Sequence, residues 1–250
     1  MEINNLEKFQ AKMASGETAL GVCVTLYDPS VSELAADAGF DFVWIDMEHS
    51  PMTIVDAMHH VMALRGTGCA PLVRVPWNEP WVLKPVLDLA PAGVIIPMVN
   101  DAAAAEAAVK ACRYPAQGGN RGCAMRRAVG YGKTSVADYM EISRTEPMVI
   151  VQIEHVEALR NLDAILRVPG VGSVCVGPYD LSCSLGKPAQ FDDPEVVEAI
   201  ETICRKTLEA GVLLGAFGAP LDVWRKRGVN WTALTTDTGS MYAHFRRLIK

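Results

Sequence analysis

Eight short runs of apolar, largely β-branched residues alternate with helical segments along the chain, and this alternation restricts the possible folds more than any other feature. The runs are residues 19–26, 40–46, 70–76, 93–99, 148–154, 173–177, 212–217 and 231–235. Runs of this kind are typical of strands buried on both faces. Because parallel strands need crossover connections, helices are expected between them.

Amphipathic segments fill the intervals between the runs, as crossover helices would. They are residues 29–38, 51–65, 81–90, 101–113, 156–168, 194–210 and 221–227, and residues 242–250 are expected to form a final helix. Eight such units predict an α/β protein with a closed (β/α)₈ TIM barrel as one domain over residues 1–250. An open doubly wound sheet is the alternative. No Gly-x-Gly-x-x-Gly turn follows the first run, so no nucleotide cofactor is predicted.

One long segment interrupts this regular pattern. Residues 114–133 are rich in Gly and Arg and contain no apolar run. Loops of this length are usually functional or disordered, whereas a solvated surface excursion is the simpler interpretation. The sequence leaves both interpretations open.

The charge balance excludes several kinds of partner. The chain has 23 Lys and Arg against 29 Asp and Glu, a net charge of −6. Such a chain has no basic field to hold a nucleic acid backbone. No apolar run approaches the roughly 18 residues that a membrane helix needs, and the first five residues lack the character of a signal peptide. We therefore predict a cytoplasmic protein without nucleic acid or membrane partners.

Polar side chains follow the carboxyl ends of several predicted strands. In a parallel barrel the reactive groups gather at this end. The groups are Asp46 and His49 after the second run, Arg74 in the third, Gln152 and Glu154 in the fifth, and the turn Gly177-Pro178-Tyr179-Asp180 after the sixth. Carboxylates, a guanidinium and an imidazole are therefore expected to meet at one mouth of the barrel.

Glu154 and Asp180 follow neighbouring strands and form a candidate metal site. Oxygen ligands suit a hard divalent cation such as Mg²⁺ or Mn²⁺, which often keeps several waters and takes further oxygens from its substrate. Two protein carboxylates can therefore suffice. The alternative is a pair of ordinary carboxylates whose oxygens accept hydrogen bonds from backbone amides.

His49 and Arg74 are candidates for catalysis and substrate binding. His49 could act as a general acid/base held in one tautomer by Asp46, although a histidine at a strand end is more often structural. Arg74 ends an apolar strand, where an unpaired charge is costly, so it needs an anion nearby. That anion could be a substrate carboxylate or keto-enolate oxygen, or Asp46 or Asp88 in a fixed ion pair.

The lysines argue against one mechanism. None of the nine lysines ends a predicted strand, so no Schiff-base lysine is expected. Carbon–carbon chemistry at a carbonyl would then rely on a metal and an arginine to stabilise an enolate.

Six motifs, taken together and in this order, resemble the class II pyruvate aldolases, the family of 4-hydroxy-2-oxoheptanedioate aldolase and 2-dehydro-3-deoxyglucarate aldolase. The motifs are GFDFVWIDMEHSP at 39–51, PLVRVPWNEP at 71–80, KPVLDLAPAGVIIPMV at 84–99, RYPAQGGNRG at 113–122, VQIEHVEALRNLDAIL at 151–166 and GPYDLSCSLG at 177–186. The resemblance covers nearly the whole chain.

The resemblance implies a role for residues at matching positions. Glu154 and Asp180 would hold Mg²⁺, Mn²⁺ or Co²⁺, and Arg74 would contact the keto oxygen of pyruvate. His49, with Asp46 beside it, would be the acid/base at the aldol hydroxyl.

Further roles also follow from the resemblance alone. Gln152 and the amides of Tyr179 and Asp180 would hold pyruvate, and Asp88 would reach the histidine of a neighbouring subunit. Enzymes of this family are (β/α)₈ barrels with a C-terminal helix swapped between subunits, assembled as hexamers from trimers of dimers. A homohexamer is therefore expected.

Two departures from better-known members bear on specificity. Some members have Gly-Val-Gly-Ser after the Arg-Gly of the long segment, where this chain continues to Arg126 and Arg127. Paired arginines there could hold an acidic aldehyde. Cys23, or a residue near it, stands where some relatives carry Trp on the first strand, which would enlarge the aldehyde pocket.

The predicted function is a metal-dependent aldolase that makes or cleaves the C3–C4 bond of 4-hydroxy-2-oxo acids, with a 2-oxo acid such as pyruvate and an aldehyde as partners. The nearer alternative is a lyase or decarboxylase that acts on oxaloacetate through the same enolate. The more distant alternative is a protein that binds 2-oxo acids without turnover.

Overall fold

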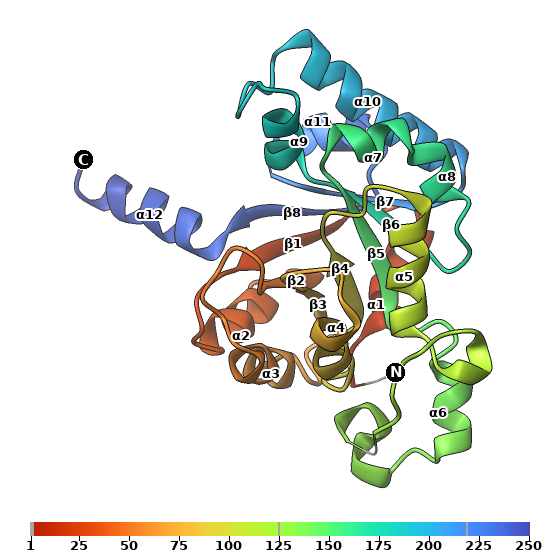
Figure 1. Ribbon diagram of the computed structural model, residues 1–250. Helices are drawn as coiled ribbons and strands as arrows, with labels where there is room; N and C mark the ends of the chain where they lie inside the picture. The colour runs from red at the N-terminus through yellow and green to blue at the C-terminus, as the bar shows by residue number, and fades with distance from the viewer. Residues whose placement is uncertain (1–2, 125, 219) are drawn as a thin grey trace.

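A computed structural model describes residues 3–124, 126–218 and 220–250, so residues 1 and 2, Met125 in the long segment and residue 219 lie outside it. Eight parallel strands close into one barrel in chain order, with β8 paired to β1 (Figure 1). The strands are β1 (Ala19–Val24), β2 (Phe42–Asp46), β3 (Ala70–Arg74), β4 (Gly93–Ile96), β5 (Met148–Ile153), β6 (Ser173–Val176), β7 (Leu213–Phe217) and β8 (Trp231–Thr236). The prediction of an α/β TIM barrel is confirmed.

The crossover helices surround the barrel and bury their apolar faces against the strands. They are α2 (Ser30–Asp37), α3 (Ile54–Ala63), α4 (Pro80–Leu87), α5 (Ala102–Cys112), α7 (Val156–Arg160), α8 (Leu162–Leu166), α10 (Pro194–Glu209) and α11 (Leu221–Lys226). The helix predicted over 156–168 is broken in two. At the break, the side-chain amide of Asn161 donates a hydrogen bond to the carbonyl of Asn100 at 2.9 Å.

Three helices were not predicted from the sequence: α1 (Leu6–Ala14), α6 (Val136–Ile142) and α9 (Pro178–Ser184). The long segment is also partly ordered, because it contains the 3₁₀ turns η1 (Pro115–Gln117) and η2 (Arg127–Gly132). Helix α1 buries Leu6, Phe9 and Met13, whose side chains join the cluster inside the barrel. Their helical spacing was visible in the sequence.

Aromatic rings fill the interior of the barrel beneath the mouth. Phe42 and Trp231 meet edge to face with ring centroids 5.5 Å apart, and Phe9 lies 5.4 Å from Phe42. Glycine on the paired strand makes room for each ring: a Cβ on Gly215 would lie 2.0 Å from the Trp231 indole, and one on Gly21 would lie 2.4 Å from the Phe42 ring. This packed layer fills the middle of the barrel, so a polar site has to lie at one of its ends.

Helix α12 (Asp237–Leu248) begins five residues earlier than predicted and extends away from the barrel (Figure 1). Its apolar side chains are open to solvent in the single chain, with Phe245 56% and Leu248 70% exposed. The helix swap between subunits stays a prediction. Across the described residues, no helix combines the length and apolar character needed to cross a membrane.

The close packing of Gly215 against Trp231 gives a testable prediction for stability. We expect Gly215→Ala to lower the free energy of unfolding by about 1–3 kcal/mol, because an added methyl group overpacks a rigid core. Urea denaturation measures the change. In a Trp231→Phe background the same substitution should cost clearly less, because the smaller ring leaves space. An equal cost in both backgrounds would contradict this account.

Candidate active site at the barrel mouth

A pocket of about 330 Å³ opens at the carboxyl ends of the strands. The structure places seven of the predicted site residues in its wall: Cys23, Asp46, His49, Arg74, Gln152, Tyr179 and Asp180. Strands β1, β2, β3 and β5 supply or precede most of these side chains, and α9 supplies the rest. The residues that the sequence analysis singled out are therefore gathered around one pocket, and their roles stay predictions.

Arg74 is the most tightly held side chain of this wall. Its Nε and Nη2 donate to the two carboxylate oxygens of Asp46 at 2.8 and 2.6 Å, and its Nη1 lies 2.9 Å from Oε2 of Glu48. The guanidinium also lies over the Trp44 ring, 5.0 Å from the centroid. Burial works to lower the pKa of Arg74, but the hydrogen bond and charge of Asp46, with the charge of Glu48, outweigh burial and raise it. The guanidinium is therefore a permanent, rigidly oriented positive charge.

Glu48 is a site residue that sequence reasoning missed. Burial raises its pKa, and the charges of Glu154, Asp46 and Asp180 raise it further against the opposing effect of Arg74, so the pKa reaches about 8. Strand β2 ends at Asp46 and Glu48 lies in the bend that follows, so its place among the polar residues after the carboxyl end of a strand was the signal available. Burial among other carboxylates therefore favours the protonated form of Glu48.

His49 is positioned differently from the prediction. The Asp46 carboxylate accepts hydrogen bonds from Arg74 and from the backbone amides of Glu48 and His49, at 3.0 and 3.4 Å for the amides, and not from the imidazole. The imidazole is 60% exposed, and its Nε2 lies 3.9 Å from Oε2 of Glu48. The prediction that Asp46 sets the histidine tautomer is therefore wrong in this structure. Arg74 takes up both carboxylate oxygens of Asp46, and the nearest carboxylate to the ring is that of Glu48.

Glu154 lies buried directly behind the pocket wall, only 2% exposed. Its Oε1 accepts a hydrogen bond from the backbone amide of Met98 at 2.7 Å, and its Oε2 accepts one from the side-chain amide of Gln152. Met98 has a φ of +54°, an uncommon conformation for a residue with a side chain, at the point where it meets this carboxylate. Gly177 approaches so closely that a Cβ there would lie 2.7 Å from the Cβ of Glu154.

The two predicted metal ligands influence each other electrostatically. Burial raises the pKa of Glu154, its two hydrogen bonds lower it, and the nearby charge of Asp180 raises it. The Oε1 atom of Gln152 is also buried without a hydrogen-bond partner in this structure. Two carboxylates that repel each other beside an unsatisfied amide oxygen fit the oxygen preference of a hard divalent cation.

No group of three or more His, Cys, Asp or Glu side chains suited to a metal occurs among the described residues. A cation held by Glu154 and Asp180 would therefore complete its coordination with water or substrate oxygens. That two protein carboxylates suffice stays a prediction.

Asp88 and Arg127 lie outside the pocket. Asp88 caps the carboxyl end of α4, and a crossover helix returns the chain to the opposite end of the barrel. Arg127 is 4% exposed, and its guanidinium donates to the backbone carbonyls of Leu89 and Val61 at 2.7 and 3.3 Å. The expectation that Arg127 holds an aldehyde is therefore corrected, because its donors are committed to the main chain. Whether Asp88 reaches a neighbouring subunit stays a prediction.

Arg126 is close enough to Asp88 for its charge to affect that carboxyl. Burial raises the pKa of Asp88, whereas the charges of Arg121, Lys84 and Arg126 lower it. Arg126 and Arg127 thus have different surroundings, and neither lines the pocket at the barrel mouth.

The remaining wall of the pocket is largely apolar. Cys23 and Phe217 line it together with Trp44, whose indole Nε1 is buried without a partner. Burial raises the pKa of the Cys23 thiol, so the thiol stays neutral. A small, neutral side chain thus lines the pocket here, and its role in accommodating an aldehyde stays a prediction.

Comparison with known proteins identifies the family to which the chain belongs. The profile of the family described as HpcH/HpaI aldolase/citrate lyase matches residues 20–243. The chain belongs to this family. It is 36% identical over 240 residues to hydroxypyruvate/pyruvate aldolase of Roseobacter denitrificans, covering 93% of this chain and 91% of the relative. It is also 36% identical over 239 residues to 5-keto-4-deoxy-D-glucarate aldolase of Escherichia coli, covering 96% and 92%.

A solved structure of an HpcH/HpaI aldolase/citrate lyase family protein from Burkholderia cenocepacia shares the fold with a TM-score of 0.90 at 29% identity, and the match covers 96% of both chains. The resemblance seen in the sequence motifs is thus confirmed over almost the whole length. As an HpcH/HpaI enzyme, the chain is a carbon–carbon lyase.

The raised pKa of Glu48 predicts a dependence of stability on pH. Between the ordinary glutamate value of 4.5 and about 8, native Glu48 keeps a proton that the unfolded chain loses. The unfolding free energy should therefore fall as the pH rises through this range. Glu48→Gln removes the contribution of this carboxyl to the pH dependence of stability. The difference between the urea midpoint of the variant and that of the unsubstituted chain, measured at the same pH in metal-free buffer, should therefore increase as the pH rises from 4.5 to about 8.

Glu33→Gln is the matched control, because Glu33 is exposed on α2 and has no side-chain partner among the described residues. Its relative midpoint should stay constant over the same range. If the urea midpoint of Glu48→Gln also differed from that of the unsubstituted chain by a constant amount over this range, the Glu48 carboxyl would have an ordinary pKa, and the prediction would be wrong.

Proposed function

We propose that this HpcH/HpaI enzyme makes and cleaves the C3–C4 bond of 4-hydroxy-2-oxo acids, with pyruvate or a close 2-oxo acid as the enolate partner and an aldehyde as the other. The observation that carries the proposal is the rigid Arg74 guanidinium in the same pocket as Asp180, with the buried Glu154 directly behind the pocket wall. A fixed positive charge beside a cation-binding carboxylate pair suits a reaction that develops negative charge on oxygen. The name of the R. denitrificans relative, a hydroxypyruvate/pyruvate aldolase, supports the same substrate class.

Arg74 would face the keto oxygen of the bound 2-oxo acid. When the C3–C4 bond breaks, the electron pair of that bond moves into the enolate, and negative charge grows on this oxygen. The guanidinium already points in a fixed direction, because Asp46 and Glu48 hold it, so little reorganisation is needed during the reaction. Gln152 and the amides of Tyr179 and Asp180 would orient the substrate carboxylate. The two amides lie in the first turn of α9, where a helix has no internal acceptors for them.

Glu154 and Asp180 would hold the divalent cation, Mg²⁺, Mn²⁺ or Co²⁺. When bound, such an ion supplies a Lewis acid that neutralises charge on the carboxylate and keto oxygens of the substrate. Glu154 is oriented for this role by its bonds to Met98 and Gln152, which leave Asp180 as the more accessible ligand.

His49 would remove the proton of the C4 hydroxyl during cleavage and return it during synthesis. Its imidazole lines the pocket and is open to solvent, so it can exchange protons with water. Glu48 is the carboxyl nearest to its Nε2, at 3.9 Å, and a short movement of either side chain would bring them into hydrogen-bond contact. Glu48 would thus be a positioning residue between Arg74 and His49.

The aldehyde would lie against the apolar wall formed by Cys23, Trp44 and Phe217. This wall has room for a substituent because Cys23 is small.

We also propose that the enzyme is a homo-oligomer, a hexamer in which α12 packs on a neighbouring copy and Asp88 faces the His49 of another. The exposed apolar side chains of α12 support this proposal, because Tyr242, Phe245 and Leu248 are open to solvent in the single chain.

Exchange of the methyl protons of pyruvate in deuterated water tests enolate formation without knowledge of the aldehyde. Nuclear magnetic resonance should show exchange with added Mg²⁺ or Mn²⁺ and none with excess chelator. Glu154→Gln should reduce the exchange rate by about two orders of magnitude or more, the scale expected when one charge-stabilising group is lost.

The matched control is Glu157→Gln, which changes an exposed glutamate three residues further along the chain and should leave the rate unchanged. Exchange that survives both the chelator and Glu154→Gln would contradict the proposal.

His49→Ala separates aldol chemistry from decarboxylation. Release of carbon dioxide from oxaloacetate needs the enolate but no acid/base at an aldol hydroxyl, so the variant should keep decarboxylation and lose aldol cleavage by about 10²–10⁴-fold. Both rates are measured on one preparation. Equal loss of the two activities would contradict the role given to His49.

A further inference from the structure

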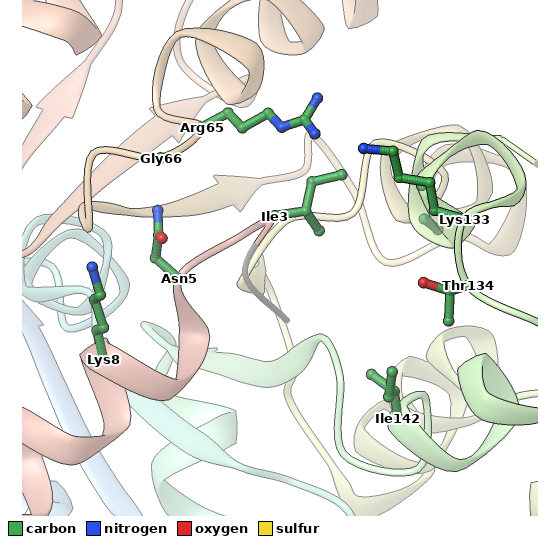
Figure 2. Close-up of a pocket in the computed structure, with 10 residues that line it drawn as sticks. Ile3, Asn5, Lys8, Arg65, Gly66, Lys133, Thr134 and Ile142 are labelled. Carbon is green, nitrogen blue, oxygen red and sulfur yellow. The ribbon is translucent and has the colours of Figure 1, made fainter.

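A second pocket lies at the other end of the barrel and belongs to no part of the aldolase site. It has a volume of about 710 Å³. It forms between the start of α1, the turn after α3 and the end of the long segment, and its lining residues include Asn5, Lys8, Arg65, Lys133 and Thr134 (Figure 2). We call this hollow the basic pocket.

Three positively charged side chains line the basic pocket, and no Asp or Glu is among its described lining residues. Within the part of the chain that the structure describes, Lys8, Arg65 and Lys133 make no ion pair and no side-chain hydrogen bond. Figure 2 shows the guanidinium of Arg65 and the amine of Lys133 directed toward each other across the hollow. Two like charges facing each other are unfavourable unless an anion lies between them.

Lysines elsewhere on this chain are commonly paired. Lys12 lies 2.8 Å from Asp41, Lys187 lies 2.6 Å from Asp193, and Lys206 lies 2.7 Å from Asp163. The protein as a whole carries a net charge of −6. The basic pocket therefore gathers three unpaired positive charges in one hollow of an acidic protein.

Arg127 adds a fourth positive charge next to the pocket. It is buried, its guanidinium bonds only to the carbonyls of Leu89 and Val61, and no carboxylate accepts from it among the described residues. Burial lowers its pKa, and the neighbouring charge of Arg65 also lowers it. A buried guanidinium without a counterion is costly, and an anion bound nearby would reduce that cost.

The walls of the pocket are well fixed. The side-chain amide of Asn5 donates to the carbonyls of Leu64 and Cys69 at 3.2 and 2.9 Å, which ties the start of α1 to the turn that carries Arg65. On the opposite wall, Gly130 has a φ of +57°, and the amide of Lys133 donates to its carbonyl at 3.3 Å. The cationic side chains thus project from an ordered frame.

We propose that the basic pocket binds a small molecule carrying two or more phosphate charges. A guanidinium matches the geometry of a phosphate with paired hydrogen bonds, and lysine amines add point charges to it. The hydroxyl of Thr134 offers a further donor on the same wall. Lys8 lies apart from Arg65 and Lys133, with Ile3 between them, so two separated anionic groups fit the arrangement better than one (Figure 2). The proposal is independent of the aldolase activity.

Pyrophosphate is the probe, and isothermal titration calorimetry at low ionic strength without added metal is the measurement. The unsubstituted protein should bind one pyrophosphate per chain, and Arg65→Ala with Lys133→Ala should weaken the affinity by about tenfold or more, because each charged hydrogen bond lost costs more than a neutral one. Both side chains are exposed, so the variant should keep its urea midpoint.

Lys226→Ala is the matched control, because this lysine is also exposed and unpaired among the described residues but lies at the end of α11. It should bind pyrophosphate as the unsubstituted protein does. The proposal is overturned if pyrophosphate does not bind, if the double variant binds it equally well, or if sulfate at equal ionic strength binds as tightly.

Discussion

The ion pair between Arg74 and Asp46 determines the organisation of the catalytic end of this barrel. Strands β2 and β3 are paired so that these two residues are direct neighbours, and the guanidinium meets both carboxylate oxygens. Removing either partner would leave a buried charge without compensation. Glu48 and Trp44 complete the surroundings of the guanidinium, and His49 is positioned by the same turn. The direction of one side chain therefore fixes the electrostatics of the pocket.

The two ends of the barrel are chemically different because the middle is filled with aromatic rings. Phe42 and Trp231 occupy the interior, and the glycines opposite them allow that close packing. Polar groups are consequently confined to the ends. The carboxyl end collects carboxylates around one guanidinium, whereas the opposite end presents unpaired positive charge. The packed interior thus separates the pocket at the carboxyl end of the barrel from the basic pocket at the other end.

The sequence predicted elements wherever one local pattern was sufficient. The eight strands are apolar runs buried on both faces, so their number and order were visible without the structure. Helix α9 was missed because the turn Gly177-Pro178 suggested an irregular loop, although Pro is favoured at the first position of a helix. The helix predicted over 156–168 was broken because Asn161 bonds to Asn100, a contact between distant positions. No periodicity in the sequence reports such a contact.

The sequence by itself determined the barrel, the end at which the polar residues gather, and the family, because strand periodicity and motif order are properties of the chain alone. Only the tertiary structure decided the partners of the charged groups. It assigned Asp46 to Arg74 instead of His49, brought Glu48 into the site, and committed Arg127 to main-chain carbonyls at the other end. The physical reason is that charge pairing depends on distances of a few ångströms between side chains, which register and packing set and linear spacing does not.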